Sequence, residues 1–334
     1  LKDEEVNERS ATAVEETGAD AWYATDAQEI LGDKYNADDY EQVTDILDVG
    51  FDSGSTHAFV VEKRDDLDRG EGKRSADLYL EGTDQHRGWF QSSLLESCGT
   101  RGDAPYDQGL THGFTVDKNG RKMSKSDKNG VDPLTVIKQY GADILRLWVT
   151  STDYFNEHRI GDEIVKNQAE AYRKIRNTMR FMIGHLADFD DAEILPIEEL
   201  PELERWVLHR MTEVDEVVRS GFDAYNYHRV YNALYNFCSV DLSAFYFDIR
   251  KDALYCDAKM TTRRRAARTV LDLVFKTVTK WFAPILVFTA EEIWQSRFPS
   301  EDGSVHLQTF HDIPNEWRDI ELGAKWDKIR TLRK

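Results

Sequence analysis

The spacing of apolar residues changes once along this chain of 334 residues, between about Ser151 and His158. Before that point, short apolar runs alternate with glycine-containing turns, whereas from about Asp162 apolar side chains recur every three or four residues. The first pattern is typical of mixed α/β folds and the second of amphipathic helices that pack in a bundle. We therefore predict an α/β region followed by an all-α region.

In the α/β region, four short apolar runs predict strands. They are residues 46–49, 59–62, 77–80 and 113–116. A helix over about 88–96 follows the third of these strands, so residues 81–86 lie at the carboxyl end of a strand, where open α/β sheets place their ligands.

Capping residues mark several helix ends. Asp132 precedes Pro133, which predicts the N-cap and first position of a helix that Gly141 ends, and Asp143 is predicted to cap the next helix. The run Thr-Ala-Glu-Glu at 289–292 has the spacing of a capping box and predicts the start of a last helix.

Two apolar stripes and two longer runs predict the helices of a bundle. The stripes begin near Asp162 and after Pro201, and helices over about 227–247 and 261–282 follow. The first stripe comprises Ile164, Gln168, Tyr172, Ile175, Met179, Met182 and Leu186, and the second comprises Leu203, Trp206, Met211, Val214, Val218 and Phe222.

The sequence Lys-Met-Ser-Lys-Ser at 122–126, here called the lysine loop, places two ammonium groups three residues apart after a flexible Asn119-Gly120 turn. Lysine is a mobile point charge and glycine lets a loop bend. Such a loop can close on a phosphate chain and stabilise the charge that develops on a leaving pyrophosphate. On its own, the same pattern also fits a solvated turn.

Five further strings carry a family resemblance. They are Asp-Ser-Gly-Ser-Thr-His at 52–57, Leu-Tyr-Leu-Glu-Gly-Thr-Asp-Gln-His-Arg-Gly-Trp at 78–89, Leu-Thr-His-Gly-Phe at 110–114, Gly-Ala-Asp-Ile-Leu-Arg-Leu-Trp at 141–148 and Phe-Cys-Ser-Val at 237–240. In this order and spacing, over about residues 21–299, the chain resembles part of the bacterial-type isoleucyl-tRNA synthetases, beginning in the second half of their catalytic domain. Valyl and leucyl enzymes share the plan and the lysine loop, but the strings at 52–57 and 81–89 resemble the isoleucyl branch.

The resemblance implies a Rossmann-type nucleotide-binding half-domain followed by a helical bundle of the anticodon-binding type. It divides the chain into an acidic segment leading into the catalytic domain (1–57), the second half of that domain with the lysine loop (58–157), the bundle (158–300) and a connector (301–334). The family's His-x-Gly-His signature, editing insertion and zinc-binding cysteine cluster do not occur in the sequence. We therefore expect a segment of a longer synthetase, inactive in isolation and without a zinc site.

The implied activity is that of a ligase that activates isoleucine with ATP, supplied as its Mg²⁺ complex, and transfers it to tRNA(Ile). Lys125 is expected to contact the ATP phosphates, with Lys122 assisting. The implied ligands of the aminoacyl-adenylate are Glu81, Gly82, Asp84, Gln85 and His112. Carboxylate and amide groups suit the ribose hydroxyls and the substrate ammonium that such a site must hold. Without the resemblance, each of these residues also fits an ordinary scaffold role.

The implied amino-acid pocket departs from the family at one wall. Trp89 matches one aromatic wall, where a flat apolar surface favours a branched aliphatic side chain. Gly50 stands where relatives have tryptophan at the other wall. This difference leaves open whether the segment belongs to a fully active enzyme.

The net charge of −19 is unevenly distributed, which reconciles it with an RNA partner. Residues 1–56 carry a net −13, so the remaining 278 residues carry only −6. Clustered arginines on helices can follow phosphates, although a solvated helix face is an equal alternative. The candidates are Arg173, Lys174, Arg176 and Arg180 in one helix and Arg263, Arg264, Arg265 and Arg268 in another.

Cysteine usage and hydropathy indicate a cytoplasmic protein without a membrane partner. Cys98, Cys238 and Cys256 form no C-x-x-C pair and are expected to be reduced, mostly packed thiols. No apolar run reaches about 18 residues, and residues 1–20 are too acidic for a targeting peptide.

Two functional classes stay open at this point. The chain is either a ligase segment or a non-catalytic tRNA-binding relic. Within the first class, valyl or leucyl specificity is the alternative to isoleucyl.

Overall fold

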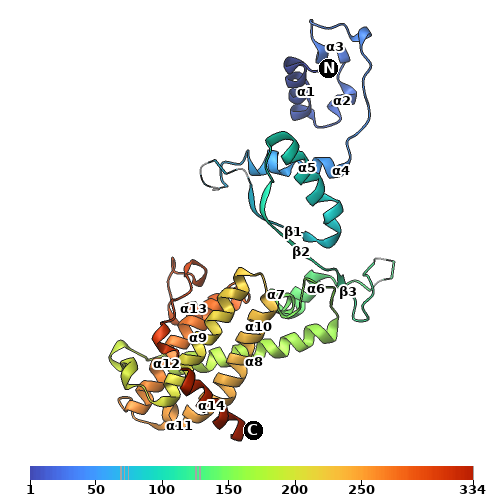
Figure 1. Cartoon of the computed structure of the whole chain (residues 1–334). Helices are drawn as coiled ribbons and strands as arrows, with labels where there is room; N and C mark the ends of the chain where they lie inside the picture. The colour runs from blue at the N-terminus through green and yellow to red at the C-terminus, as the bar shows by residue number, and fades with distance from the viewer. Residues whose placement is uncertain (68–69, 71, 74, 125, 128, 334) are drawn as a thin grey trace. The chain divides into compact units, whose positions relative to one another are not determined.

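The computed structural model describes residues 1–67, 70, 72–73, 75–124, 126–127 and 129–333. It divides the chain into two compact units (Figure 1). One consists of residues 1–80 and 84–110, and the other of residues 81–83 and 111–334.

The first unit begins with three short helices, α1 (Glu4–Thr17), α2 (Ala21–Ala24) and α3 (Ala27–Leu31). They pack around Val6, Ile30 and Leu31. Asp3 caps α1 by accepting from two backbone N–H groups of its first turn, and its carboxylate also pairs with Lys34 at 2.6 Å. The acidic amino-terminal residues therefore form a small helical cluster.

The rest of this unit contains α4 (Val49–Gly54), a π-helical segment (His57–Val61), α5 (Trp89–Arg101) and most of the paired strands β1 (Ala76–Gly82) and β2 (Tyr106–His112). The strand predicted at 77–80 and the helix that follows it are confirmed, and the helix is longer than expected. The strands predicted at 46–49 and 59–62 are wrong. Asp48 caps a helix there by accepting from Gly50 N at 2.7 Å, and a four-residue apolar run fits one helical turn as well as a strand.

In the second unit, two-residue strands β3 (Thr115–Val116) and β4 (His158–Arg159) pair in parallel, which shortens the strand predicted at 113–116. Helices α6 (Pro133–Tyr140) and α7 (Ala142–Ser151) lie between them in sequence. The predicted cap of α6 is confirmed, because Asp132 accepts from Leu134 N and Thr135 N. Gly141, at φ 91°, ends α6 and begins α7.

An all-α bundle follows, as predicted (Figure 1). Its core surrounds fully buried Trp206 and Trp281. The predicted helix at 227–247 continues to residue 256, and the first stripe is displaced at its start, where Val165 and Ala169 are buried. The helices are α8 (Asp162–Leu186), α9 (Glu202–Asp223), α10 (Tyr227–Asn236), a π-helical run (Phe237–Phe247), α11 (Asp248–Cys256), α12 (Thr262–Phe282), α13 (Val287–Arg297) and α14 (Ile320–Arg333).

The carboxyl-terminal residues, predicted to be a connector, pack on the bundle. Leu322 of α14 is buried in the main core. The Trp326 ring lies 6.1 Å from the Trp206 ring and 6.0 Å from the Phe245 ring. These contacts make α14 an additional layer of the bundle.

The three cysteines are free thiols, but only Cys238 is buried. Burial raises the pKa of the Cys238 thiol above its usual range. Cys98 and Cys256 are exposed, so the expectation of mostly packed thiols is wrong for these two. None of the described helices combines the length and apolar character that a membrane span requires.

Candidate functional site

The base of the lysine loop is held by a buried carboxylate. Asp117, 8% exposed, accepts from Asn119 N at 2.8 Å, Arg121 N at 2.9 Å and Asn129 Nδ2 at 3.0 Å. The hydrogen bonds from Arg121 N and the Asn129 amide lower the pKa of Asp117. Asp117 is therefore a negatively charged anchor for the residues that precede the loop.

Asn129 ties both limbs of the loop together. Its amide oxygen accepts from Ser124 N at 2.9 Å and its amide nitrogen donates to Lys122 O at 3.1 Å. The Lys122 side chain is exposed, whereas Lys125 lies outside the described residues. Sequence reasoning missed Asn129, and only its position just after the lysine loop is a signal for it.

The predicted adenylate residues at 81–85 lie at and just after the end of β1. Glu81 is exposed and Gly82 is buried at the end of the strand, while Asp84 and Gln85 belong to the short helical turn Thr83–Arg87. The Gln85 amide oxygen accepts from Trp89 N at 3.0 Å, so it caps the first turn of α5. Its amide nitrogen donates to the Asp84 carboxylate at 3.2 Å. Asp84 and Gln85 are thus mutually oriented.

Trp89 and Gly50 belong to different local environments of the first unit. The Trp89 indole stacks on Tyr79 with centroids 4.3 Å apart and donates to Ser53 O at 2.8 Å. Gly50 lies in the first turn of α4 and lines a hollow of about 370 Å³ whose other lining residues do not include Trp89. That Trp89 and Gly50 form two walls of one amino-acid pocket stays a prediction.

His112 ends β2, and its backbone neighbour requires glycine. Its Nδ1 lies 2.9 Å from Gly113 O, and a carbonyl only accepts, so Nδ1 carries the proton. A Cβ at Gly113 would lie 2.2 Å from the backbone carbon of Asn156. This close approach fixes the segment after His112 against the turn that leads into β4.

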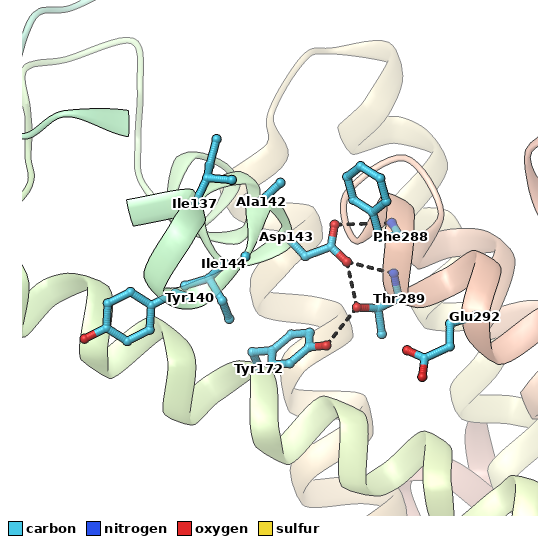
Figure 2. Close-up of a pocket in the computed structure, with 10 residues that line it drawn as sticks. Ile137, Tyr140, Ala142, Asp143, Ile144, Tyr172, Phe288, Thr289 and Glu292 are labelled. Carbon is cyan, nitrogen blue, oxygen red and sulfur yellow. Dashed lines mark hydrogen bonds between the residues drawn. The ribbon is translucent and has the colours of Figure 1, made fainter. Parts of the chain in front are cut away.

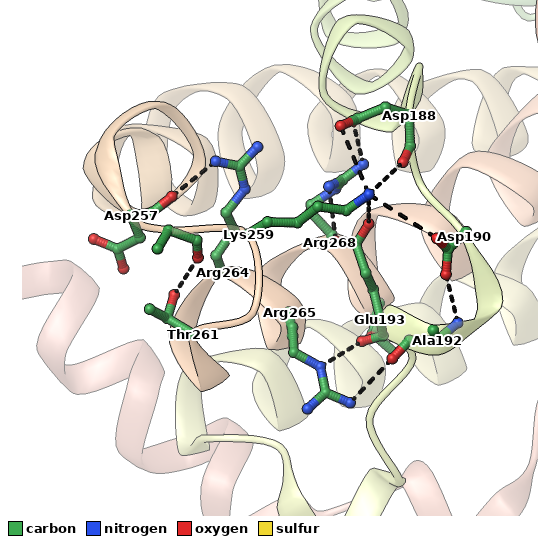
Figure 3. Close-up of polar contacts among 12 residues, drawn as sticks. Asp188, Asp190, Ala192, Glu193, Asp257, Lys259, Thr261, Arg264, Arg265 and Arg268 are labelled. Carbon is green, nitrogen blue, oxygen red and sulfur yellow. Dashed lines mark hydrogen bonds and ion pairs between the residues drawn. The ribbon is translucent and has the colours of Figure 1, made fainter.

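Most of the predicted RNA-facing arginines have protein partners. Arg173 pairs with Glu170, and Arg176 with Glu292 at 2.8 Å. In α12, the guanidinium groups of Arg264 and Arg265 donate to backbone carbonyls (Figure 3). The remaining contacts are Lys174 with the Tyr235 hydroxyl at 3.1 Å and Arg263 with Asp257 at 2.6 Å.

Arg268 is a structural residue, so its prediction as an RNA-facing residue is wrong. It is fully buried and donates to Glu193 at 2.7 Å and to Asp188 at 2.6 Å (Figure 3). Its guanidinium carbon also lies 5.3 Å from the centroid of the Phe189 ring. Glu193 is also fully buried and meets Lys259 at 3.3 Å. This pair attaches the α8–α9 connection to α12.

Arg180 is exposed beside a hollow of about 360 Å³ on the bundle. Phe181, His185 and Tyr255 line the same hollow, with the Tyr255 ring edge-on to the His185 ring at 4.6 Å. Tyr255 is 68% exposed. The Phe181 and His185 rings are partly buried. A guanidinium beside an exposed aromatic ring is a combination that can hold an unpaired base and its phosphate.

Two family models match the chain. Residues 1–161 match tRNA synthetases class I (I, L, M and V), and residues 204–334 match the anticodon-binding domain of tRNA ligase. The chain is similar to the isoleucine–tRNA ligase of Ruegeria pomeroyi, with 59% identity over 96% of the chain and 33% of that protein. The Mesorhizobium japonicum isoleucine–tRNA ligase is 56% identical over the whole chain and 33% of its own length. The chain thus spans about a third of these relatives.

Solved structures share the fold at low sequence identity. The Agrobacterium radiobacter LeuRS in its ternary complex with tRNA and LeuAMS superposes with a TM-score of 0.60 at 17% identity, over 73% of this chain and 29% of that one. The Mycobacterium tuberculosis methionyl-tRNA synthetase in complex with methionyl-adenylate gives 0.56 at 20% identity, over 69% and 47%. These matches confirm the predicted half-domain and helical bundle.

Proposed function

This chain belongs to the isoleucine–tRNA ligase family of class I tRNA synthetases, and we propose that it supplies the lysine-loop part of the catalytic domain and the tRNA-holding bundle of such a ligase. The observation that carries the proposal is the identity of 59% over 96% of the chain. The proposed substrates are isoleucine, ATP as its Mg²⁺ complex, and tRNA(Ile). Because the reaction belongs to translation, we place the enzyme in the cytoplasm.

The proposed chemistry is positioning and electrostatics. The isoleucine carboxylate attacks the α-phosphorus of ATP and pyrophosphate leaves with its negative charge, which forms isoleucyl-adenylate. A hydroxyl of the terminal ribose of the tRNA then attacks the acyl carbon, and AMP leaves. No protein nucleophile is required. Lys125 and Lys122 are assigned to the phosphates, and Glu81, Gly82, Asp84, Gln85 and His112 to the adenylate. The Asp117–Asn129 anchor supports this assignment, because it holds the backbone of Lys122 and Ser124 in one arrangement.

The full-length enzyme that contains this chain tests the proposal. We expect pyrophosphate exchange that depends on isoleucine, and charging of tRNA(Ile). Exchange that prefers valine or leucine would assign another specificity, and tRNA binding without exchange would assign a non-catalytic role.

Gly50→Trp tests whether Gly50 lines the amino-acid pocket. If it does, the indole should tighten isoleucine by about 1–3 kcal/mol and improve discrimination against valine, seen as a lower KM in pyrophosphate exchange. A Cβ at Gly50 lies 2.8 Å from Asp48 Oδ1, so the capping carboxylate must rotate. Gly50→Ala is the matched control, because it has the same clash without the indole. Equal KM values in both variants would remove Gly50 from the pocket.

Arg180→Ala tests whether the hollow lined by Arg180, Phe181, His185 and Tyr255 holds tRNA. Loss of one phosphate contact should weaken tRNA binding most at low salt and reduce the slope of log K against log salt by about 1. Arg173→Ala on the same helix is the control, because Arg173 is already paired with Glu170. Filter binding from low to high salt measures both slopes. An unchanged slope for Arg180→Ala, or an equal change in the control, would place the RNA elsewhere.

A further inference from the structure

The amino end of α13 is capped by a residue from a distant helix. Asp143 of α7 accepts from Thr289 N at 2.8 Å, Thr289 Oγ1 at 2.6 Å and Phe288 N at 3.3 Å, beside a hollow of about 440 Å³ (Figure 2). The capping box predicted at Thr289 is therefore wrong, and so is the prediction that Asp143 caps its own helix. Asp143 is 6% exposed, so these N–H groups satisfy a carboxylate that has little access to water.

One turn further along α7, Arg146 binds the other side of the same connection. Its Nε donates to Ile285 O at 3.0 Å and its Nη2 donates to Pro284 O at 2.7 Å. These carbonyls follow the end of α12, where backbone oxygens lack helical partners. An anion therefore faces the positive end of α13 and a cation faces the carbonyls after α12, the two arrangements that helix dipoles favour. We name Asp143, Arg146 and their partners at 284–289 the α7 joint.

Helix α8 is tied to the same point. The Tyr172 hydroxyl lies 2.8 Å from Thr289 Oγ1, and because that oxygen donates to Asp143, Tyr172 is the donor to Thr289 (Figure 2). Arg176, one turn later, forms two hydrogen bonds with Glu292, at 2.8 and 2.9 Å. This pairing lowers the pKa of Glu292. Helices α7, α8 and α13 thus meet in one hydrogen-bonded network.

The same α7 helix also packs against the flanks of the lysine loop. Ile144 and Trp148 are buried in a cluster with Val136 of α6. Met123 and Val131, which lie within and just after the loop, pack on this cluster. Helix α7 therefore contacts the lysine-loop segment through apolar side chains. It contacts the bundle through Asp143 and Arg146 and also through the buried Leu147.

We propose that Asp143 and Arg146 are positioning residues that set the placement of the bundle relative to the lysine-loop segment, so that a tRNA held on the bundle presents its terminal ribose correctly. The inference rests on the proposed function. Transfer to tRNA depends on this placement, because misplacing a reacting group by about 1 Å can cost on the order of 100-fold in rate. Adenylate formation uses only small molecules and does not need the bundle.

Thr289→Val in the full-length enzyme tests the joint with the least disturbance. Valine has the shape of threonine but cannot donate to Asp143 or accept from Tyr172, whereas Thr289→Ser keeps the hydroxyl and is the matched control. We expect Thr289→Val to lower kcat/KM for tRNA charging by about tenfold while isoleucine-dependent pyrophosphate exchange stays within about twofold. Thr289→Ser should charge tRNA at about the wild-type rate. Asp143→Asn removes the negative charge and places an amide NH₂ near the donors of Phe288 and Thr289. It should therefore show the same selective loss of charging.

Several outcomes decide the matter. If Thr289→Val loses charging and exchange equally, or loses neither, the proposed positioning role of the α7 joint is overturned. The proposed function is then unaffected. A wild-type enzyme without isoleucine-dependent exchange would instead overturn the proposed function and this inference with it. If Asp143→Asn does not fold, the Thr289 pair still gives the answer.

Discussion

Replacing Lys125 by alanine in the full-length enzyme is expected to lower the rate of isoleucine-dependent pyrophosphate exchange by about 100- to 1000-fold. One preorganised electrostatic contact to charge that develops in a transition state contributes about 2–4 kcal/mol. The charge on the leaving pyrophosphate grows mainly in the transition state, so kcat should fall far more than the affinity for isoleucine. Steady-state exchange with varied isoleucine and varied ATP separates the two effects.

A matched control for Lys125 lies on the neighbouring helix. Lys138 of α6 is an exposed lysine outside the loop, and Lys138→Ala removes the same charge from the same unit. We expect it to keep the wild-type rate. If Lys125→Ala raises only the KM for isoleucine, or if both variants lose the same activity, the lysine loop does not act on the phosphates.

Sequence patterns predicted structure correctly where the interacting residues are close together in sequence. The cap at Asp132 followed from adjacent residues, because an N-cap side chain reaches donors only two or three positions away. The short runs at 46–49 and 59–62 failed because four apolar residues fit either a strand or a helical turn. Asp143 failed for another reason, since the donors it satisfies belong to a helix that begins at residue 287.

The candidate site shows the same division. The position of residues 81–85 at the end of a strand could be predicted from spacing, whereas the roles of these residues and of the lysine loop stay predictions. The contribution of Asn129 could not be predicted, because its hydrogen bonds with Lys122 O and Ser124 N depend on how the loop folds back in space. Arginine clusters were the weakest signal, since a buried arginine and a solvated one look alike in sequence.

Arg268 provides the sharpest test of that last distinction. Arg268→Met should lower the stability of the chain by about 3–5 kcal/mol, because it leaves the fully buried Glu193 without its main partner. Urea or thermal unfolding followed by circular dichroism measures the loss. Arg263→Met is the matched control on the same helix. The Arg263 side chain is 54% exposed in its ion pair with Asp257, so we expect a much smaller loss of stability than for Arg268→Met.

The double variant Arg268→Met with Glu193→Met distinguishes two roles for Arg268, that of a partner in a buried ion pair and that of an RNA-binding residue. Removing both charges eliminates the unpaired carboxylate, and replacing a buried pair by apolar side chains of similar volume is often neutral or stabilising. Much of the lost stability should therefore return, although Lys259 then loses its 3.3 Å contact with Glu193. If Arg268 instead contacts RNA, the single variant would keep its stability and lose tRNA affinity. Recovery in the double variant without a change in tRNA affinity would establish that this arginine attaches the α8–α9 connection to α12.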